Sequence, residues 1–382
     1  MVSVVAPDRI DVVDDGSWAG PDPDVAPPPV VGPFVAVLRQ VAAAGDVRDC
    51  GHDAEAILAA ARRVEALGIG DYAAGLDALD AGVLFHHAAD VLAGADPRSA
   101  WAALQGALSA SVPGAAHRQA VVPPGAARAV AWLPVKPSTP GWTVQVRHPA
   151  LHGWGEPADS RGLVDVVEDS LPGRFGGVRL SFDPPPAPRR ADDDLLAGPD
   201  RLLVHGAVIL LGLLGGTVRR LVLEAYAHAR LPRPGGTPLW QHQAVAIRLG
   251  EVAVRQQALR LLLHDAVAEP DPQFGSAAYR PAVHRFALAE ATWIARESLQ
   301  VAAGHGYVGS APLRVLTEQV RVLAGALAAL ASALPSADGR ASDPLPDPVP
   351  DPVPDPVSGG GQPRVSPTRD SGGADPFPGI AS

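Results

Sequence analysis

The sequence predicts a mainly helical α+β protein whose helices form bundles on both sides of a central β domain. Ala- and Leu-rich segments with apolar residues at helical spacing fill both halves of the 382-residue chain. Between residues 123 and 190, Pro and Gly recur every few positions and short apolar alternation predicts strands. The expected parts are a Pro/Asp-rich arm at 1–33, an N-terminal helical domain at 34–118, a β domain at 119–192, a C-terminal four-helix bundle at 193–335 and a Pro-rich tail at 336–382.

The N-terminal helical domain is expected to contain four helices, which Gly and Asp-Pro pairs separate. Residues 6–33 before it are rich in Pro and Asp, and such a composition buries too little apolar surface to offset the entropy of ordering. We therefore expect a disordered arm followed by helices at 34–44, 53–66, 74–93 and 97–110.

The central β domain is expected from alternation in two short segments. Trp142, Val144 and Val146 alternate with polar residues, and so do Val178, Leu180 and Phe182, as half-buried strands require.

The C-terminal bundle is expected to contain helices at about 195–230, 239–268, 281–303 and 312–333. In the first of these, 17 residues from Leu202 to Val218 carry no formal charge, which is the short limit for a membrane span. Four glycines and His205 disfavour insertion, and the helical pattern continues into a charged segment. We expect a buried core helix and no membrane span, in which the G-x-x-x-G pair of Gly212 and Gly216 permits close helix packing.

The tail contains the repeat DPLPDPVPDPVPDPV, whose alternate prolines favour an extended polyproline II conformation. It is expected to lie outside the fold, either as a flexible solubilising tail or as a docking peptide for a partner.

Charge and cysteine content exclude several classes of protein. The chain has 31 Lys and Arg against 41 Asp and Glu, a net charge of −10 and no basic cluster, so nucleic acid is not an expected partner. Cys50 is the single cysteine, which excludes an intramolecular disulfide and a zinc-binding thiol cluster. The first residues show no signal peptide, and we expect a cytoplasmic protein.

Two glycine turns in the C-terminal half are the most informative part of the sequence. Gly304, Gly306 and Gly309 spell G-x-G-x-x-G, but that dinucleotide fingerprint needs a preceding strand. Here a helix precedes the turn, because Leu288, Ala291, Ala295, Leu299 and Ala302 form one helical stripe. The other turn lies in PGGTPLWQHQAVAIRLGE, residues 234–251, and opens a second long helix.

Together the two turns resemble the C-terminal helical domain of acyl-CoA dehydrogenases, which carries "FGxPIxxxQ" and later "LQxxGGxGYxxE". The resemblance covers roughly residues 195–330, and the upstream part only loosely, although VRLSFDPPPAP resembles the strand with which the family leaves its β domain. The positions that match the two turns are Gly236, Pro238, Leu239, Gln243, Leu299, Gln300, Gly304, Gly306, Tyr307 and Pro312.

The resemblance implies a role for FAD, which in this family lies between subunits and oxidises an acyl-CoA thioester. It implies that Gln243, Gln300 and the backbone at Gly304 hold the adenine and pyrophosphate half of a neighbouring subunit's FAD. An amide offers donors and an acceptor, and glycine lets backbone N–H groups approach a phosphate. The family's arginine before the first turn corresponds to Arg230 or Arg233. The alternative is structural, with Gln243 capping a turn, Gln300 facing solvent and Gly304 ending a helix.

The family's catalytic base is missing from its usual place. The glutamate of "GYxxE" removes the substrate's α-proton, and Ser310 stands at that position. The family's second location for the base falls near Val204 or His205, where there is no carboxylate. His205 is either a substitute base or a hydrogen-bonded core residue.

Other parts of the family pattern also differ. Gly235 replaces the aromatic residue that packs on the flavin, and Glu318-Gln319 replaces an "RD" pair. The flavin-contacting "TExxxGSD" stretch is missing from residues 112–128. His86 and His87 are not expected to share a metal, because adjacent residues on a helix point about 100° apart. His148 and His152 have ligand-like spacing, but Pro149 and Gly153 indicate a loop and no acid-histidine pair supports a metal site.

The resemblance therefore implies FAD-linked α,β-dehydrogenation of an acyl-CoA, with this chain as a catalytically degenerate subunit of an oligomer with an acyl-CoA dehydrogenase homologue. A non-catalytic binding or scaffold protein that keeps the bundle for assembly is the alternative. A third possibility is an active enzyme in which His205, Glu224 or Glu297 serves as the base.

Overall fold

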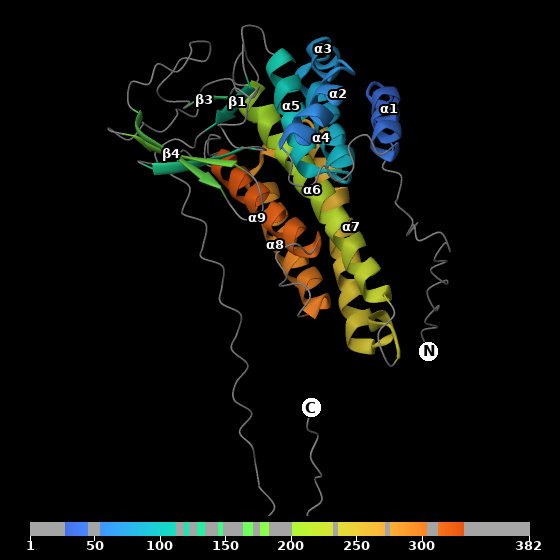
Figure 1. Cartoon of the computed structure of the whole chain (residues 1–382). Helices are drawn as coiled ribbons and strands as arrows, with labels where there is room; N and C mark the ends of the chain where they lie inside the picture. Colours follow the sequence, from blue (N-terminus) through green and yellow to red (C-terminus); the bar gives the residue numbers. More distant parts are fainter. Residues whose placement is uncertain are drawn as a thin grey trace, which may run out of the picture. The chain divides into compact units, whose positions relative to one another are not determined.

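The structure is a computed structural model, and it describes the residues in which the helices and strands lie (Figure 1). The described residues are 27–44, 54–111, 118–121, 128–133, 144–147, 163–170, 176–182, 201–231, 236–271, 276–303 and 312–331.

The N-terminal helices follow the predicted order with one difference. The predicted helix at 74–93 begins at Ala78 instead, where Asp77 caps it, and a short helix that was not predicted precedes it and ends before Gly75. The Asp77 carboxylate accepts a hydrogen bond of 2.8 Å from the backbone N–H of Asp80. The helices are α1 (Gly32–Ala43), α2 (Ala54–Glu65), α3 (Ile69–Ala74), α4 (Ala78–Ala93) and α5 (Pro97–Ser111).

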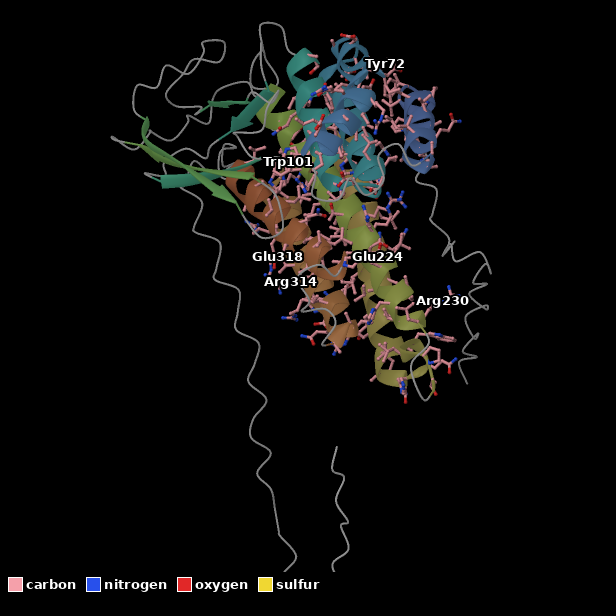
Figure 2. All side chains as sticks on the ribbon, viewed as in Figure 1. Tyr72, Trp101, Glu224, Arg230, Arg314 and Glu318 are labelled. Atoms are coloured by element: carbon pink, nitrogen blue, oxygen red, sulfur yellow. The ribbon has the colours of Figure 1, made fainter. Side chains whose placement is uncertain are left out.

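An aromatic contact ties α1 to α3. The hydroxyl of Tyr72 (Figure 2) donates a 2.6 Å hydrogen bond to the carbonyl of Val30, and the rings of Tyr72 and Phe34 stack with centroids 5.2 Å apart. This contact positions α1, whose Val35 and Leu38 are buried, against the remaining N-terminal helices.

Five strands lie in or at the edge of the segment predicted as a β domain. β1 and β3 pair in parallel, whereas β2, β5 and β4 form an antiparallel sheet in that order. Val178–Phe182 lies in β5 as predicted, but Trp142 falls outside the described residues. A single β domain of the family's kind stays a prediction. The strands are β1 (Arg118–Val121), β2 (Arg128–Leu133), β3 (Val144–Arg147), β4 (Leu163–Ser170) and β5 (Gly176–Phe182).

The C-terminal helices confirm the mainly helical prediction for this half of the chain. Short 3-10 helices precede two of them, and Pro281 stands at the first position of α8, where its fixed φ suits a helix start. The elements are α6 (Arg201–Arg230), η2 (Leu239–Gln241), α7 (Gln243–Ala268), η3 (Ala277–Tyr279), α8 (Pro281–Val301) and α9 (Pro312–Ala331).

Helices α4 and α6 form the centre of the core, and two glycines of α6 make their close approach possible. A Cβ at Gly212 would collide with the carbonyl oxygen of His86 and lie 2.7 Å from the Cβ of Ala89. A Cβ at Gly216 would collide with the carbonyl oxygen of Asp90. The G-x-x-x-G pair therefore serves helix packing inside the bundle, as the sequence predicts.

Helix α6 also has the length and hydropathy of a membrane span. In the described chain it alone passes that test, from Val204 to Arg230, and 78% of its most apolar window is buried. Its apolar side chains pack against the other helices, including Val204, Leu211, Leu214 and Val218, which are fully buried. The expectation of a core helix agrees with this burial.

Candidate functional site

The residues predicted to contact FAD lie at three helix ends. Arg230 is the last residue of α6 (Figure 2), Gln243 is the first of α7, and Gln300 is the penultimate residue of α8. All three side chains are exposed. Gly304 and Arg233 lie outside the described residues.

The start of α7 offers hydrogen-bond donors to an anion. No side chain caps this helix, because its N-cap residue His242 makes no such hydrogen bond. The first backbone N–H groups of a helix attract phosphate through their direction and the helix dipole. The uncapped start of α7 and the exposed amide of Gln243 therefore fit the phosphate-bearing half of a flavin dinucleotide.

Of the candidate bases, His205 is part of the core. It is 2% exposed, its Nε2 lies 3.0 Å from the carbonyl oxygen of Ala78, and its ring centroid lies 5.5 Å from that of Phe85. Of the two interpretations of His205, a substitute base or a hydrogen-bonded core residue, the structure agrees with the second.

The two glutamates considered as bases lie on different helices, α6 and α8. Glu297 on α8 forms ion pairs with Arg248 at 3.0 Å and Arg296 at 3.2 Å, so its carboxylate joins α8 to α7. Glu224 lies half-buried along α6, six residues before Arg230 (Figure 2). Ser310 lies outside the described residues.

The structure reveals a buried polar cluster around Asp90 that the sequence analysis missed. The Oδ2 atom of Asp90, on α4, lies 3.6 Å from Nε of Arg260, 3.9 Å from Nη2 of Arg219 and 4.0 Å from Nε2 of His264. Arg260 and His264 come from α7, where they follow Gln256 at four-residue spacing. This row of polar residues on an otherwise apolar helix face is the sequence pattern that could have indicated a buried polar cluster.

Three histidine rings pack together beside this cluster. The ring of His264 stacks on that of His87 at 4.5 Å and meets that of His86 edge-on at 4.8 Å. Burial lowers the pKa of His87 to about 3, with help from the neighbouring His86 and Arg39. Burial also lowers the pKa of His86 and of His264, so all three rings are neutral near pH 7. Within the described segments, no group of three or more His, Cys, Asp or Glu side chains could hold a metal ion.

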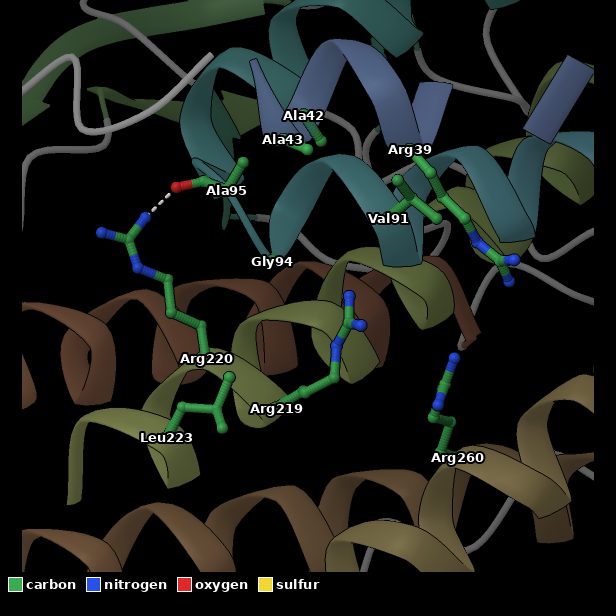
Figure 3. A pocket seen from close by; sticks show the side chains of 10 residues that line it. All are labelled: Arg39, Ala42, Ala43, Val91, Gly94, Ala95, Arg219, Arg220, Leu223 and Arg260. Atoms are coloured by element: carbon green, nitrogen blue, oxygen red, sulfur yellow. Dashed lines mark hydrogen bonds between the residues drawn. The ribbon is translucent and has the colours of Figure 1, made fainter. Parts of the chain in front are cut away.

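A pocket of about 300 Å³ opens next to Asp90 between α1, α4, α6 and α7 (Figure 3). Its lining is dominated by four arginines, with Leu223, Val91 and several alanines as apolar walls. The four arginines are Arg39, Arg219, Arg220 and Arg260.

One family model matches part of the chain. Residues 200–326 match the family described as acyl-CoA dehydrogenase, C-terminal domain. No curated protein matches the chain.

Solved structures give the fold of most of the chain. Butyryl-CoA dehydrogenase from Megasphaera elsdenii is 13% identical with a TM-score of 0.51, and the match covers 77% of this chain and 93% of that one. A putative acyl-CoA dehydrogenase from Mycobacterium smegmatis is 15% identical with a TM-score of 0.51, covering 78% and 96%. The Tcur3481-Tcur3483 steroid ACAD is 19% identical with a TM-score of 0.50, covering 79% and 97%.

Proposed function

We propose that this chain, which belongs to the acyl-CoA dehydrogenase family through its C-terminal domain, is a catalytically degenerate subunit that completes the flavin site of a homologous partner. The reaction of the assembly would be the FAD-linked α,β-dehydrogenation of an acyl-CoA thioester. One contrast carries the proposal. The side chains suited to holding a neighbour's FAD are exposed, whereas His205 is buried in the core and Glu297 is held in ion pairs.

The contribution of this chain would be binding and orientation of the cofactor. Exposed amides at Gln243 and Gln300 offer donors and acceptors to an adenine or a diphosphate, and Arg230 adds a positive charge. FAD, when bound, supplies the hydride acceptor for the β-carbon of the acyl group. The base that removes the α-proton would come from the partner, because Ser310 occupies the family's usual glutamate position.

Helix α7 presents an apolar stripe that suits a partner's helices. Ile247, Val254 and Leu261 are seven residues apart, which places them on one helix face, and they are 55%, 70% and 38% exposed. Exposed apolar side chains that group on one face often mark a site of interaction with another protein. The uncapped start of the same helix carries Gln243, so one partner docked along α7 would reach both features.

The fold supports one class of partner. A homologue of the same family would present a matching helical bundle, and one structure similar to this chain, the steroid ACAD, is named for two components, Tcur3481 and Tcur3483. We therefore propose an acyl-CoA dehydrogenase homologue as the second subunit.

An activity assay tests the proposal. The chain would be purified alone and after co-expression with a neighbouring homologue, and each preparation would be offered acyl-CoA thioesters with an artificial electron acceptor. We expect turnover by the co-purified complex and none by the chain alone. Turnover by the chain alone would contradict the proposal and redirect attention to His205, Glu224 and Glu297.

Variants of the complex separate cofactor contact from structural effects. Gln243→Ala and Gln300→Ala are expected to lower the flavin content of the complex, because each removes an amide that faces the cofactor. Glu224→Gln is the matched control and should leave both the flavin content and the turnover unchanged. Loss of turnover at full flavin content in Glu224→Gln would instead identify Glu224 as the base.

A further inference from the structure

We propose that the arginine pocket between α1, α4, α6 and α7 is a binding site for a phosphate-bearing anion (Figure 3). The inference is independent of the flavin site, which lies at the helix ends carrying Arg230, Gln243 and Gln300. It rests on the charge gathered at the pocket and on a glycine that makes room for one of the arginines.

Positive charge is concentrated in a concave site. Arg39 comes from α1, Arg219 from α6 and Arg260 from α7, so three helices contribute guanidinium groups to one pocket. Figure 3 shows Arg39 and Arg260 extending toward each other, with Arg219 between them and the end of α4. In the described part of the chain, no carboxylate lines the pocket. Grouped like charges with partly apolar walls attract an anion strongly.

The ion pairs behind the pocket are longer than charge-assisted hydrogen bonds. Asp90 lies 3.6 Å from Arg260 and 3.9 Å from Arg219, whereas a guanidinium donates to a carboxylate at about 2.8 Å when the pair is tight. Arg260 is 5% exposed, and burial lowers its pKa, because desolvation disfavours the charged guanidinium group. An anion in the pocket would stabilise that charge.

The backbone around the pocket is shaped for Arg219. Gly94 lies at the end of α4, and a Cβ there would be 2.6 Å from Nη2 of Arg219. Nη2 also donates a 3.0 Å hydrogen bond to the carbonyl of Asp90. The guanidinium group of Arg219 therefore lies at the end of α4, in the space that the missing side chain of Gly94 leaves. Arg220 has a different role, because it donates a hydrogen bond to the carbonyl of Ala95.

These features favour phosphate over other anions. A phosphate offers several oxygens to more than one guanidinium fork at once, whereas a carboxylate offers two. A volume of about 300 Å³ exceeds that of a single phosphate and leaves space beside Leu223 and the alanines for an organic group. The ligand class is thus a phosphate or diphosphate, free or carried by a small organic molecule such as a nucleotide.

Isothermal titration calorimetry with the full chain tests this inference. The probes are inorganic phosphate, inorganic pyrophosphate, ADP and coenzyme A, each titrated at low and at high salt. We expect saturable binding of at least one probe that weakens as salt increases. If only phosphate or pyrophosphate binds, the site takes a free anion. If only ADP or coenzyme A binds, the site requires the organic group that carries the phosphate.

The variants Arg39→Gln, Arg260→Gln and Gly94→Ala locate the site. Arg39→Gln removes a cation from an exposed helix position and should weaken binding about tenfold, the effect of one charge-assisted contact. Gly94→Ala displaces only the mobile end of Arg219 and should also weaken binding while the helical circular dichroism stays unchanged. The matched control is Arg285→Gln, because Arg285 is exposed on α8 outside the pocket lining.

Two results would overturn the inference. One is the absence of binding by all four probes at millimolar concentration. The other is binding that Arg39→Gln, Arg260→Gln and Gly94→Ala leave equal to that of the Arg285→Gln control. These titrations need neither flavin nor a partner. A result that contradicts anion binding therefore leaves the proposed function intact, and a result that contradicts the proposed function leaves anion binding intact.

Discussion

At the scale of single residues, the buried histidines couple stability to pH. Burial lowers the pKa of His87 to about 3 and that of His284 to about 4, and it also lowers the pKa of His86 and His264. In the unfolded chain these groups titrate near pH 6.5. The unfolded state therefore binds more protons below pH 6.5, and the free energy of unfolding should fall as the pH falls.

Urea denaturation measures this effect. We expect a constant unfolding free energy above about pH 7 and, at pH 5, a loss of about 2 kcal/mol for each buried histidine that stays neutral. The variant His87→Gln should show a shallower pH dependence, because it has no ring to protonate. Equal slopes in the parent and His87→Gln would contradict the assignment of the pH effect to this cluster.

Single residues also mark where prediction from sequence fails. His205 was correctly offered as a hydrogen-bonded core residue, because a lone histidine in an apolar helix needs a partner. The cluster of Asp90, Arg219 and His264 was missed, since its members lie on three helices far apart in the sequence. Periodicity within one helix shows which face is buried, but it does not show which polar groups of different helices meet.

At the scale of elements, the contact between α4 and α6 is the feature most sensitive to side-chain size. Gly212→Val should lower the free energy of unfolding by about 3 kcal/mol or more, because a side chain at this position meets the backbone of α4, which has no freedom to move aside. Chemical denaturation with circular dichroism detection measures the change.

The control for that variant is a glycine without neighbours. Gly250 lies in α7, and nothing lies within 4 Å of the place where its Cβ would be. Gly250→Ala should raise stability by up to about 1 kcal/mol, because alanine favours the helix more than glycine does. Similar destabilisation by both variants would indicate a general intolerance of glycine replacement, and not a specific α4–α6 contact.

Helix α7 carries the prediction about assembly. Val254→Lys places a charge on its exposed apolar stripe and should abolish co-purification with the homologous partner without changing the unfolding free energy of the chain by more than about 0.5 kcal/mol. Val37→Lys is the matched control, because Val37 is an exposed valine on α1. Co-purification of Val254→Lys at the parent's yield would show that the partner binds elsewhere.

Element positions were largely predictable because the helical pattern is strong. Helices α6 to α9 lie within a few residues of their predicted ranges, since Pro and Gly mark their ends. The short helix α3 was missed, and the helix after it was predicted to begin at residue 74, although α4 begins at Ala78. Gly75 ends α3, and the side chain of Asp77 caps the start of α4.

At the scale of the whole molecule, the family resemblance and the fold agree, and the proposed role within the family depends on a partner. The C-terminal domain matches the acyl-CoA dehydrogenase family over residues 200–326, and the similar solved structures extend the fold over about three quarters of the chain. Sequence reasoning reached this family through the two glycine turns. The arginine pocket could not be predicted from the sequence, because residues of four packed helices form it.

The central claim is that the chain helps to hold a flavin that belongs to a partner. The most direct test is the absorbance spectrum between roughly 350 and 500 nm, where flavin absorbs. The spectrum would be recorded for the chain purified alone and again after co-expression with a neighbouring acyl-CoA dehydrogenase homologue. The account predicts flavin bands only in the co-purified complex. Flavin bands in the chain alone would contradict it by showing a complete cofactor site, and a complex without flavin would contradict it in favour of a scaffold.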